Sequence, residues 1–216
     1  MGTNSAALER TVRWSGPISI VGGILYALGA LLHPVGEDLA AVLNPRWVPS
    51  HVIYWAAAIL MIISLGGVYA RQSKESGKLG LIGFVLALIG TAVVCGIFFL
   101  VSTAIPLIAN EAPALFERAM APRPWAMPAV ILGYVLGYVL FGIATMRANV
   151  LPRWAGAALV LGSVLFFISE TPLFGHNTSH ALVTIGDVIF GLGFVGIGYG
   201  LWSEPRYADG SANRES

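Results

Sequence analysis

The segment Ser179–Trp202 reads SHALVTIGDVIFGLGFVGIGYGLW and holds one carboxylate, Asp187, in an otherwise apolar run. About 20 consecutive apolar residues in a helix are enough to cross the roughly 30 Å hydrocarbon core of a bilayer. A helix satisfies all of its backbone hydrogen bonds internally, which hydrocarbon requires of any spanning segment. The segment therefore predicts a membrane-spanning helix that carries one acidic side chain partway along its length.

Five further charge-poor windows precede this segment. The chain has 216 residues, of which 56% are hydrophobic and 11% charged, whereas a soluble domain carries roughly 25% charged residues. We therefore predict an all-α integral membrane protein, a bundle of six transmembrane helices over residues 1–203. Residues 204–216 form a polar tail that we expect to be disordered. The other five windows are Gly16–Leu32, Ser50–Ala70, Leu79–Pro106, Trp125–Met146 and Pro152–Ser169.

The distribution of Lys and Arg predicts the orientation, because these residues are enriched in cytoplasmic loops. Nine lie on one side of the predicted bundle: Arg10, Arg13, Arg71, Lys74, Lys78, Arg147, Arg153, Arg206 and Arg214. Three lie on the other: Arg46, Arg118 and Arg123. The tryptophans expected in the interfacial belts are Trp14, Trp154 and Trp202 inside, and Trp47 and Trp125 outside. We predict a multi-pass protein of the cell membrane with both termini in the cytoplasm.

The first two and the last two helices have similar starts. Arg13–Gly16 (RWSG) resembles Arg153–Gly156 (RWAG), and the second and sixth helices each begin with Ser-His. One interpretation is a parallel repeat of helices 1–2 and 5–6 about an axis along the membrane normal. The other is that Arg-Trp is a common interfacial anchor and serine a common N-cap. In the repeat, Gly22 is equivalent to Gly162 and His51 to His180.

The titratable side chains of the predicted bundle gather near its outer surface. All four histidines lie there: His33, His51, His176 and His180. Glu170 ends the fifth helix on the same side, and Asp187 lies about 10 Å deeper than His180. A carboxylate at that depth costs about 2.5–3.5 kcal/mol and usually has a partner, here His180, Thr184 or Tyr54. A hydrogen-bonded packing role for Asp187 is the simpler alternative.

The leading functional hypothesis is a cofactor site beneath the outer surface. Neutral imidazole binds metals, and two imidazoles can ligate haem b axially. His51 and His180 are the first candidate ligands of haem b or a divalent metal, with His33 as a further candidate for either and His176 as a further metal ligand. Arg46 could then meet a haem propionate. Such a protein would have a redox or metal-handling role.

Three other functions fit the same pattern. One is a cofactor-free membrane enzyme that performs acid–base chemistry on a lipid or an isoprenoid, with Asp187 or Glu170 as the acid. Another is a small transporter in which Asp187 relays protons. The third is a membrane subunit or homo-oligomer whose glycine-rich helix surfaces are contact faces.

Several features of the sequence restrict the kinds of ligand and metal site that we expect. The net charge of +1 gives no reason to expect nucleic-acid binding. Cys95 is the only cysteine, which excludes disulfides within the chain and a cysteine-based zinc or iron–sulfur site. The spacing His176-x-x-x-His180 suits zinc only if both residues lie on one helix, and Asn177–Ser179 resembles a cap that would leave His176 outside it.

Short helices are expected in two of the outer loops. Glu37–Leu43 follows a glycine and carries acids in its first turn, and Pro113–Met120 begins with a proline suited to that position. Pro172–Ser179 is expected to form the turn between the last two spans.

Overall fold

The computed structural model describes residues 2–120, 130–170 and 176–203, without the side chains of residues 2–8 and 176–178. The described residues are helical almost throughout and contain no strand. The predicted tail, Trp125 and residues 172–175 of the predicted turn lie outside them. The helices are α1 (Gly2–Leu32), α2 (Leu39–Val42), α3 (Trp47–Glu111), α4 (Pro113–Met120), the π-helix η1 (Ile131–Val135), α6 (Leu136–Ala148), α7 (Arg153–Ser169) and α8 (His176–Ser203).

Four of the described helices are long and apolar enough to cross a membrane. They are the segments Glu9–Leu32, Trp47–Glu111, Ile131–Ala148 and Ser179–Ser203. Helix α7 is also apolar but has only 17 residues. The protein is therefore all-α in its described part, with several helices suited to a bilayer, as the composition predicts.

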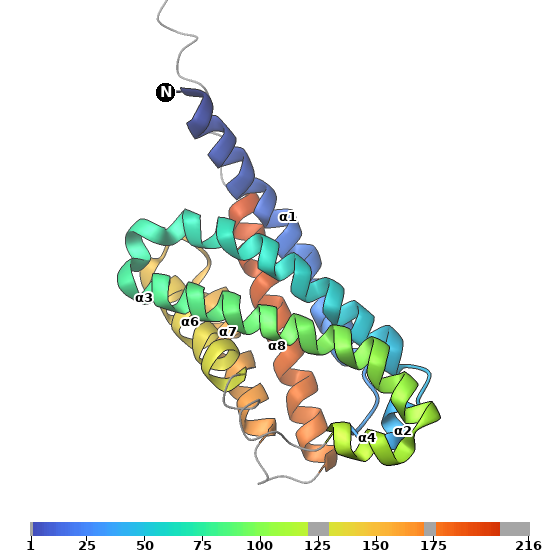
Figure 1. Ribbon diagram of the computed structural model, residues 1–216. Helices are drawn as coiled ribbons and strands as arrows, with labels where there is room; N and C mark the ends of the chain where they lie inside the picture. The colour runs from blue at the N-terminus through green and yellow to red at the C-terminus, as the bar shows by residue number, and fades with distance from the viewer. Residues whose placement is uncertain (1, 121–129, 171–175, 204–216) are drawn as a thin grey trace, which may run out of the picture.

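Helix α3 consists of two arms that meet at Gly77. This glycine has φ +56° and ψ −151°, a conformation outside the helical region, which reverses the chain. The arms, residues 47–76 and 78–111, run side by side in Figure 1. Ring pairs placed symmetrically about the break join them: Tyr69 stacks on Phe84 at 4.6 Å, and Tyr54 stacks on Phe98 at 4.8 Å. The two arms are thus antiparallel.

Small residues allow the helices of the bundle to pack closely. A Cβ at Gly23 of α1 would collide with the backbone of Gly191 in α8. A Cβ at Gly142 of α6 would lie 2.5 Å from the carbonyl oxygen of Gly156 in α7. Such small-residue contacts are typical of helix packing in membranes, where lipid removes the hydrophobic drive to associate.

Trp47 has a different role from the predicted one. Its side chain is fully buried and its Nε1 donates to the carbonyl oxygen of Val101 at 2.8 Å. It packs with Val42 of α2 and Phe116 of α4 in a hydrophobic cluster separate from the main core. The predicted belt position for Trp47 is therefore wrong, since a belt residue faces the interface. Trp14 is 57% exposed, as a belt residue would be.

Short helices form in both loops where they were expected, but α2 covers only Leu39–Val42, and Glu37 and Asp38 precede it instead of lying in its first turn. Helix α4 has the predicted bounds, and α2 begins after Asp38, whose carboxylate accepts a hydrogen bond from the backbone N–H of Ala41 at 2.8 Å. Gly36 precedes this helix with φ +89°. Helix α8 begins at His176 rather than at Ser179, so His176 and His180 lie one turn apart on the same helix.

Candidate functional site

Three histidines from separate segments lie together at one end of the bundle. His33 follows α1, His51 lies in the first turns of α3, and His180 lies near the start of α8. The ring centroids of His33 and His51 are 4.8 Å apart, and those of His33 and His180 are 6.2 Å apart. The structure thus brings together three of the four predicted histidines, while the side chain of His176 is not described.

Backbone carbonyls fix the tautomers of two of these rings. Nδ1 of His33 lies 2.7 Å from the carbonyl oxygen of Pro34, and Nδ1 of His51 lies 2.8 Å from that of Trp47. A carbonyl oxygen only accepts, so each Nδ1 must carry the proton that is donated. In the neutral ring, Nε2 therefore keeps its lone pair. Nε2 of His33 is 3.6 Å from Glu37 Oε1, too far for a hydrogen bond.

The environment of His33 disfavours its charged form. Burial, followed by the neighbouring His51, lowers its pKa from 6.5 to about 4. In the unfolded chain the ring would take up a proton near pH 6.5. The folded state resists this, so the stabilising contribution is complete above pH 6.5 and is lost as the pH falls toward 4.

We therefore expect His33 to stay neutral from pH 8 to pH 5 in the metal-free protein, and acid to destabilise the fold by up to about 3 kcal/mol through this group. Side-chain ¹⁵N NMR of histidine-labelled protein in detergent, with chelator present, measures the titration directly. His33→Gln identifies the resonance. A His33 midpoint near pH 6.5 would show that the ring is not shielded from water.

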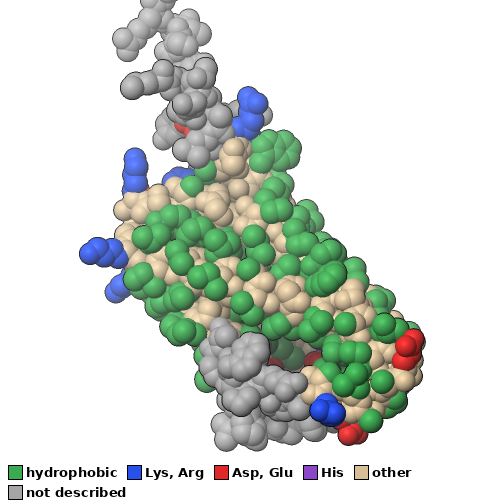
Figure 2. Space-filling view, viewed as in Figure 1, with side chains coloured by type: hydrophobic (Ala, Val, Ile, Leu, Met, Phe, Trp, Pro, Cys, Tyr) green, Lys and Arg blue, Asp and Glu red, His purple; other side chains and the backbone are tan. Residues whose placement is uncertain are grey.

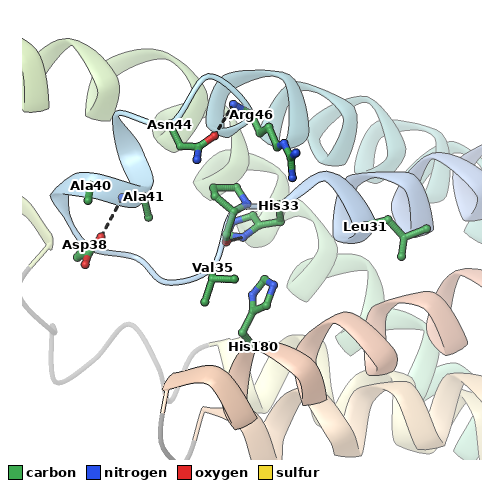
Figure 3. A pocket seen from close by; sticks show the side chains of 10 residues that line it. Leu31, His33, Val35, Asp38, Ala40, Ala41, Asn44, Arg46 and His180 are labelled. Carbon is green, nitrogen blue, oxygen red and sulfur yellow. Dashed lines mark hydrogen bonds between the residues drawn. The ribbon is translucent and has the colours of Figure 1, made fainter.

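An open pocket of about 580 Å³ lies in front of His33 and His180. Figure 3 shows the His180 ring extending from α8 toward His33, with Arg46 and Asn44 on the opposite wall. The backbone N–H of Arg46 donates to Asn44 Oδ1 at 3.0 Å, which shapes the turn before α3. The predicted Arg46 therefore lines the same pocket as two of the predicted histidines.

Asp187 lies deeper in the bundle and is only 7% exposed. The hydroxyl of Tyr54 donates to its Oδ2 at 2.6 Å. Of the three partners predicted for Asp187, the structure thus gives Tyr54. Thr184 instead donates to the carbonyl oxygen of His180 at 2.8 Å, within its own helix.

A second phenolic pair lies beside this carboxyl. Tyr134 donates to the hydroxyl of Tyr26 at 2.8 Å, and the rings of Tyr26 and Tyr54 meet edge to face at 4.9 Å. Tyr134, which lies buried in η1, was not among the predicted site residues. The sequence does contain an indication of this residue, because a polar ring in the middle of a predicted span usually faces the bundle interior.

Glu170 caps the end of α7 and is exposed. Partial removal from water, and then the carboxylate of Glu170, raise the pKa of Glu37. The Glu37 side chain is nevertheless 65% exposed, so water strongly screens its repulsion from Glu170. Glu170 thus belongs to the acidic surroundings of the site, and the pocket lining does not include it.

The described residues do not support the haem prediction. A porphyrin ligated by both His51 and His180 would have to share its volume with the His33 ring, which lies 4.8 and 6.2 Å from them. Within the described ranges, no group of three His, Cys, Asp or Glu side chains is arranged as a bound metal ion would require. Any metal site would therefore need side chains to turn.

Comparisons of the chain with known protein families, with curated proteins and with solved structures find no match. The interpretation of the site therefore depends on its own geometry.

Proposed function

We propose that the chain crosses the cell membrane six times and has both termini in the cytoplasm. The two antiparallel arms of α3 support two crossings, since each is longer than 30 Å at 1.5 Å per residue. Helix α7, at about 26 Å, is nearly long enough for another. In Figure 2, Lys and Arg gather at the end that holds the α3 turn, and acidic side chains are seen mainly at the opposite end. This asymmetry supports a cytoplasmic α3 turn.

Cysteine labelling tests this topology. In a Cys95→Ser background, Leu43→Cys and Glu111→Cys are expected to react with a membrane-impermeant maleimide in intact cells. Glu75→Cys, next to the α3 turn, is expected to react only after the cells are opened. All three positions are exposed. Equal labelling of all three in intact cells would contradict two crossings by α3.

We also propose that the first and last helix pairs are a parallel repeat, because equivalent residues make equivalent contacts. A Cβ at Gly22 would lie 3.5 Å from the carbonyl oxygen of Ala57. A Cβ at Gly162 would lie 2.6 Å from the carbonyl oxygen of Gly186. The register taken from the two Ser-His pairs makes Ala57 equivalent to Gly186.

A second pair of contacts follows the same register near the other end of the helices. A Cβ at Gly67 would collide with Ser15, and a Cβ at Gly196 would lie 2.9 Å from the Cβ of Ala155. Gly67 is equivalent to Gly196, and Ser15 to Ala155. Chance similarity of interfacial anchors does not account for matching contacts at two depths, so the repeat is the better interpretation.

For the function, we propose that the protein binds a small polar ligand at the extracytoplasmic surface, in the pocket in front of His33 and His180. The observation that carries this is the combination of an open pocket with imidazole, guanidinium and amide groups on its walls. A ligand site commonly has a few converging polar groups in a concave surface.

Filling the pocket tests this function. Ala40 is an exposed residue of α2 that lines the pocket, and Ala40→Trp would occupy it. The matched control is Leu115→Trp on α4, which is exposed and outside the lining. The panel is inorganic phosphate, succinate, Mg²⁺ and Zn²⁺.

A ligand at 100 times its Kd is expected to raise the Tm by about 5 °C or more. This rise should persist in Leu115→Trp and vanish in Ala40→Trp. The proposal fails if no member of the panel raises the Tm of the wild type. It also fails if a ligand raises the Tm of Ala40→Trp as much as that of the wild type.

A second candidate function is acid–base chemistry, favoured by the buried pair of Tyr54 and Asp187. An ionisable residue inside a membrane domain is a functional candidate by default. On this hypothesis Asp187→Asn, which keeps the shape of the side chain, abolishes turnover of a ligand that the outer pocket still binds. Unchanged turnover would exclude Asp187 as the acid.

A further inference from the structure

We propose that His33 and His180, which line the outer pocket, bind a transition-metal ion such as Zn²⁺ through their Nε2 atoms, together with Nε2 of the buried His51 beside them. This inference rests on the proposed function of that pocket and names the class of its ligand. It does not include haem.

The first support is the way the rings are held. Metal-binding histidines almost always donate their other ring N–H to a carboxylate, a backbone carbonyl or water, which fixes the tautomer and the orientation. His33 and His51 both donate Nδ1–H to backbone carbonyl oxygens, at 2.7 and 2.8 Å. Each ring is thus oriented with Nε2 as an available lone-pair donor.

The second support is the distance between the ring centroids of the histidines. Zinc lies 2.0–2.1 Å from a ligating nitrogen, which puts it about 3.2 Å from the ring centroid. Two rings that share one ion are therefore at most about 6.4 Å apart, and about 5 Å apart at the tetrahedral angle. The two separations from His33, 4.8 Å to His51 and 6.2 Å to His180, fall within this range. The His180 ring would in addition have to come within this distance of the His51 ring.

One movement is needed to complete the site. The three rings do not yet surround a common point. His180 extends into the open pocket, where its ring has room to turn toward His33 (Figure 3). His51 is buried and held by its backbone bond, so it would stay in place.

The chemistry of the donors selects the metal. Imidazole suits Zn²⁺, Cu²⁺, Ni²⁺ and iron, whereas Mg²⁺ and Ca²⁺ prefer oxygen ligands. Glu37 Oε1, 3.6 Å from Nε2 of His33, offers a carboxylate beside the three nitrogens. Arg46 brings a positive charge to the same pocket, and Asp38, which also lines it, offsets this charge. Three nitrogen ligands would leave a coordination position open toward the pocket.

The test uses full-length protein purified in detergent through a tag that contains no histidine. Titration with Zn²⁺, followed by calorimetry, is expected to give one site per chain. Co²⁺ in its place is expected to give the visible absorption of a tetrahedral complex. His33→Ala and His180→Ala should each weaken binding at least about 100-fold. The matched control is Leu115→Ala on α4, which is exposed, lies outside the pocket lining, removes no imidazole and should bind normally.

His51→Asn separates ligation from folding. The Asn amide nitrogen can take the place of Nδ1 and keep the bond to the carbonyl oxygen of Trp47, but it has no counterpart of Nε2. This variant is expected to keep the wild-type Tm and to lose the metal. Saturable binding that survives His51→Asn, or no stoichiometric binding in the wild type, would overturn the proposal.

The two possible failures can be told apart. If phosphate or succinate shifts the Tm in a manner that Ala40→Trp abolishes, and Zn²⁺ does not bind, the pocket function stands and the metal is rejected. If Ala40→Trp alters the Tm shift of none of the ligands, Zn²⁺ included, the pocket function itself is rejected.

Discussion

Gly90→Ala is expected to unfold in detergent at a markedly lower temperature than the wild type. A Cβ at Gly90, in the second arm of α3, would collide with backbone atoms of Gly133 and Tyr134 in η1. Backbone atoms cannot turn away as a flexible side chain can, so the two helices must separate. Such overpacking costs about 1–3 kcal/mol, and more where the backbone itself must shift.

Gly96→Ala provides a matched control on the same arm. A Cβ at Gly96 would meet no atom within 4 Å. Alanine is about 1 kcal/mol better than glycine inside a helix, so this variant should be as stable as the wild type or more so. Thermal unfolding by circular dichroism compares the two. Equal Tm values for Gly90→Ala and Gly96→Ala would contradict the close packing of α3 on η1.

The second large effect is expected at Tyr54. Tyr54→Phe removes only the hydroxyl that bonds Asp187 at 2.6 Å. The carboxyl remains buried without this donor, and such a loss costs about 1–3 kcal/mol. Replacing both partners by apolar groups of similar shape can be nearly neutral. The double variant Tyr54→Phe/Asp187→Leu is therefore expected to be more stable than Tyr54→Phe alone.

Unfolding free energies of the wild type, both single variants and the double variant measure the coupling between the two side chains. Tyr69→Phe is the matched control, because this ring lies on the same arm and stacks on Phe84. It should change the free energy of unfolding by less than about 0.5 kcal/mol. Strict additivity of the two substitutions would mean that the bond contributes nothing to stability.

The sequence predicted much of the site because a membrane makes polar residues informative. Asp187 was identified from one carboxylate in an apolar run, since its cost in lipid requires a partner. His33, His51 and His180 were grouped because their ends of the spans share one surface. The mutual distances of these three rings, however, depend on how α1, α3 and α8 pack, and local sequence does not specify this.

Other features could not be found from the sequence for physical reasons. Trp47 was assigned to the interface because tryptophan is amphipathic, yet α2 and α4 cover it and Val101 accepts its N–H. The polar ring of Tyr134 is visible in the sequence, but its hydrogen-bond partner Tyr26 belongs to α1, and local sequence does not specify this pairing. Both outcomes are set by neighbouring segments rather than by the residues themselves.

The sequence by itself determined the all-α membrane class and the approximate limits of the apolar helices, because the bilayer imposes length and apolarity on each segment separately. It also determined that histidines and acids gather toward one end. Only the tertiary structure decided that Tyr54 is the partner of Asp187 and that three imidazoles meet beside a pocket. Those contacts join residues far apart in the chain, and helix packing through small residues such as Gly23 and Gly90 fixes which faces meet.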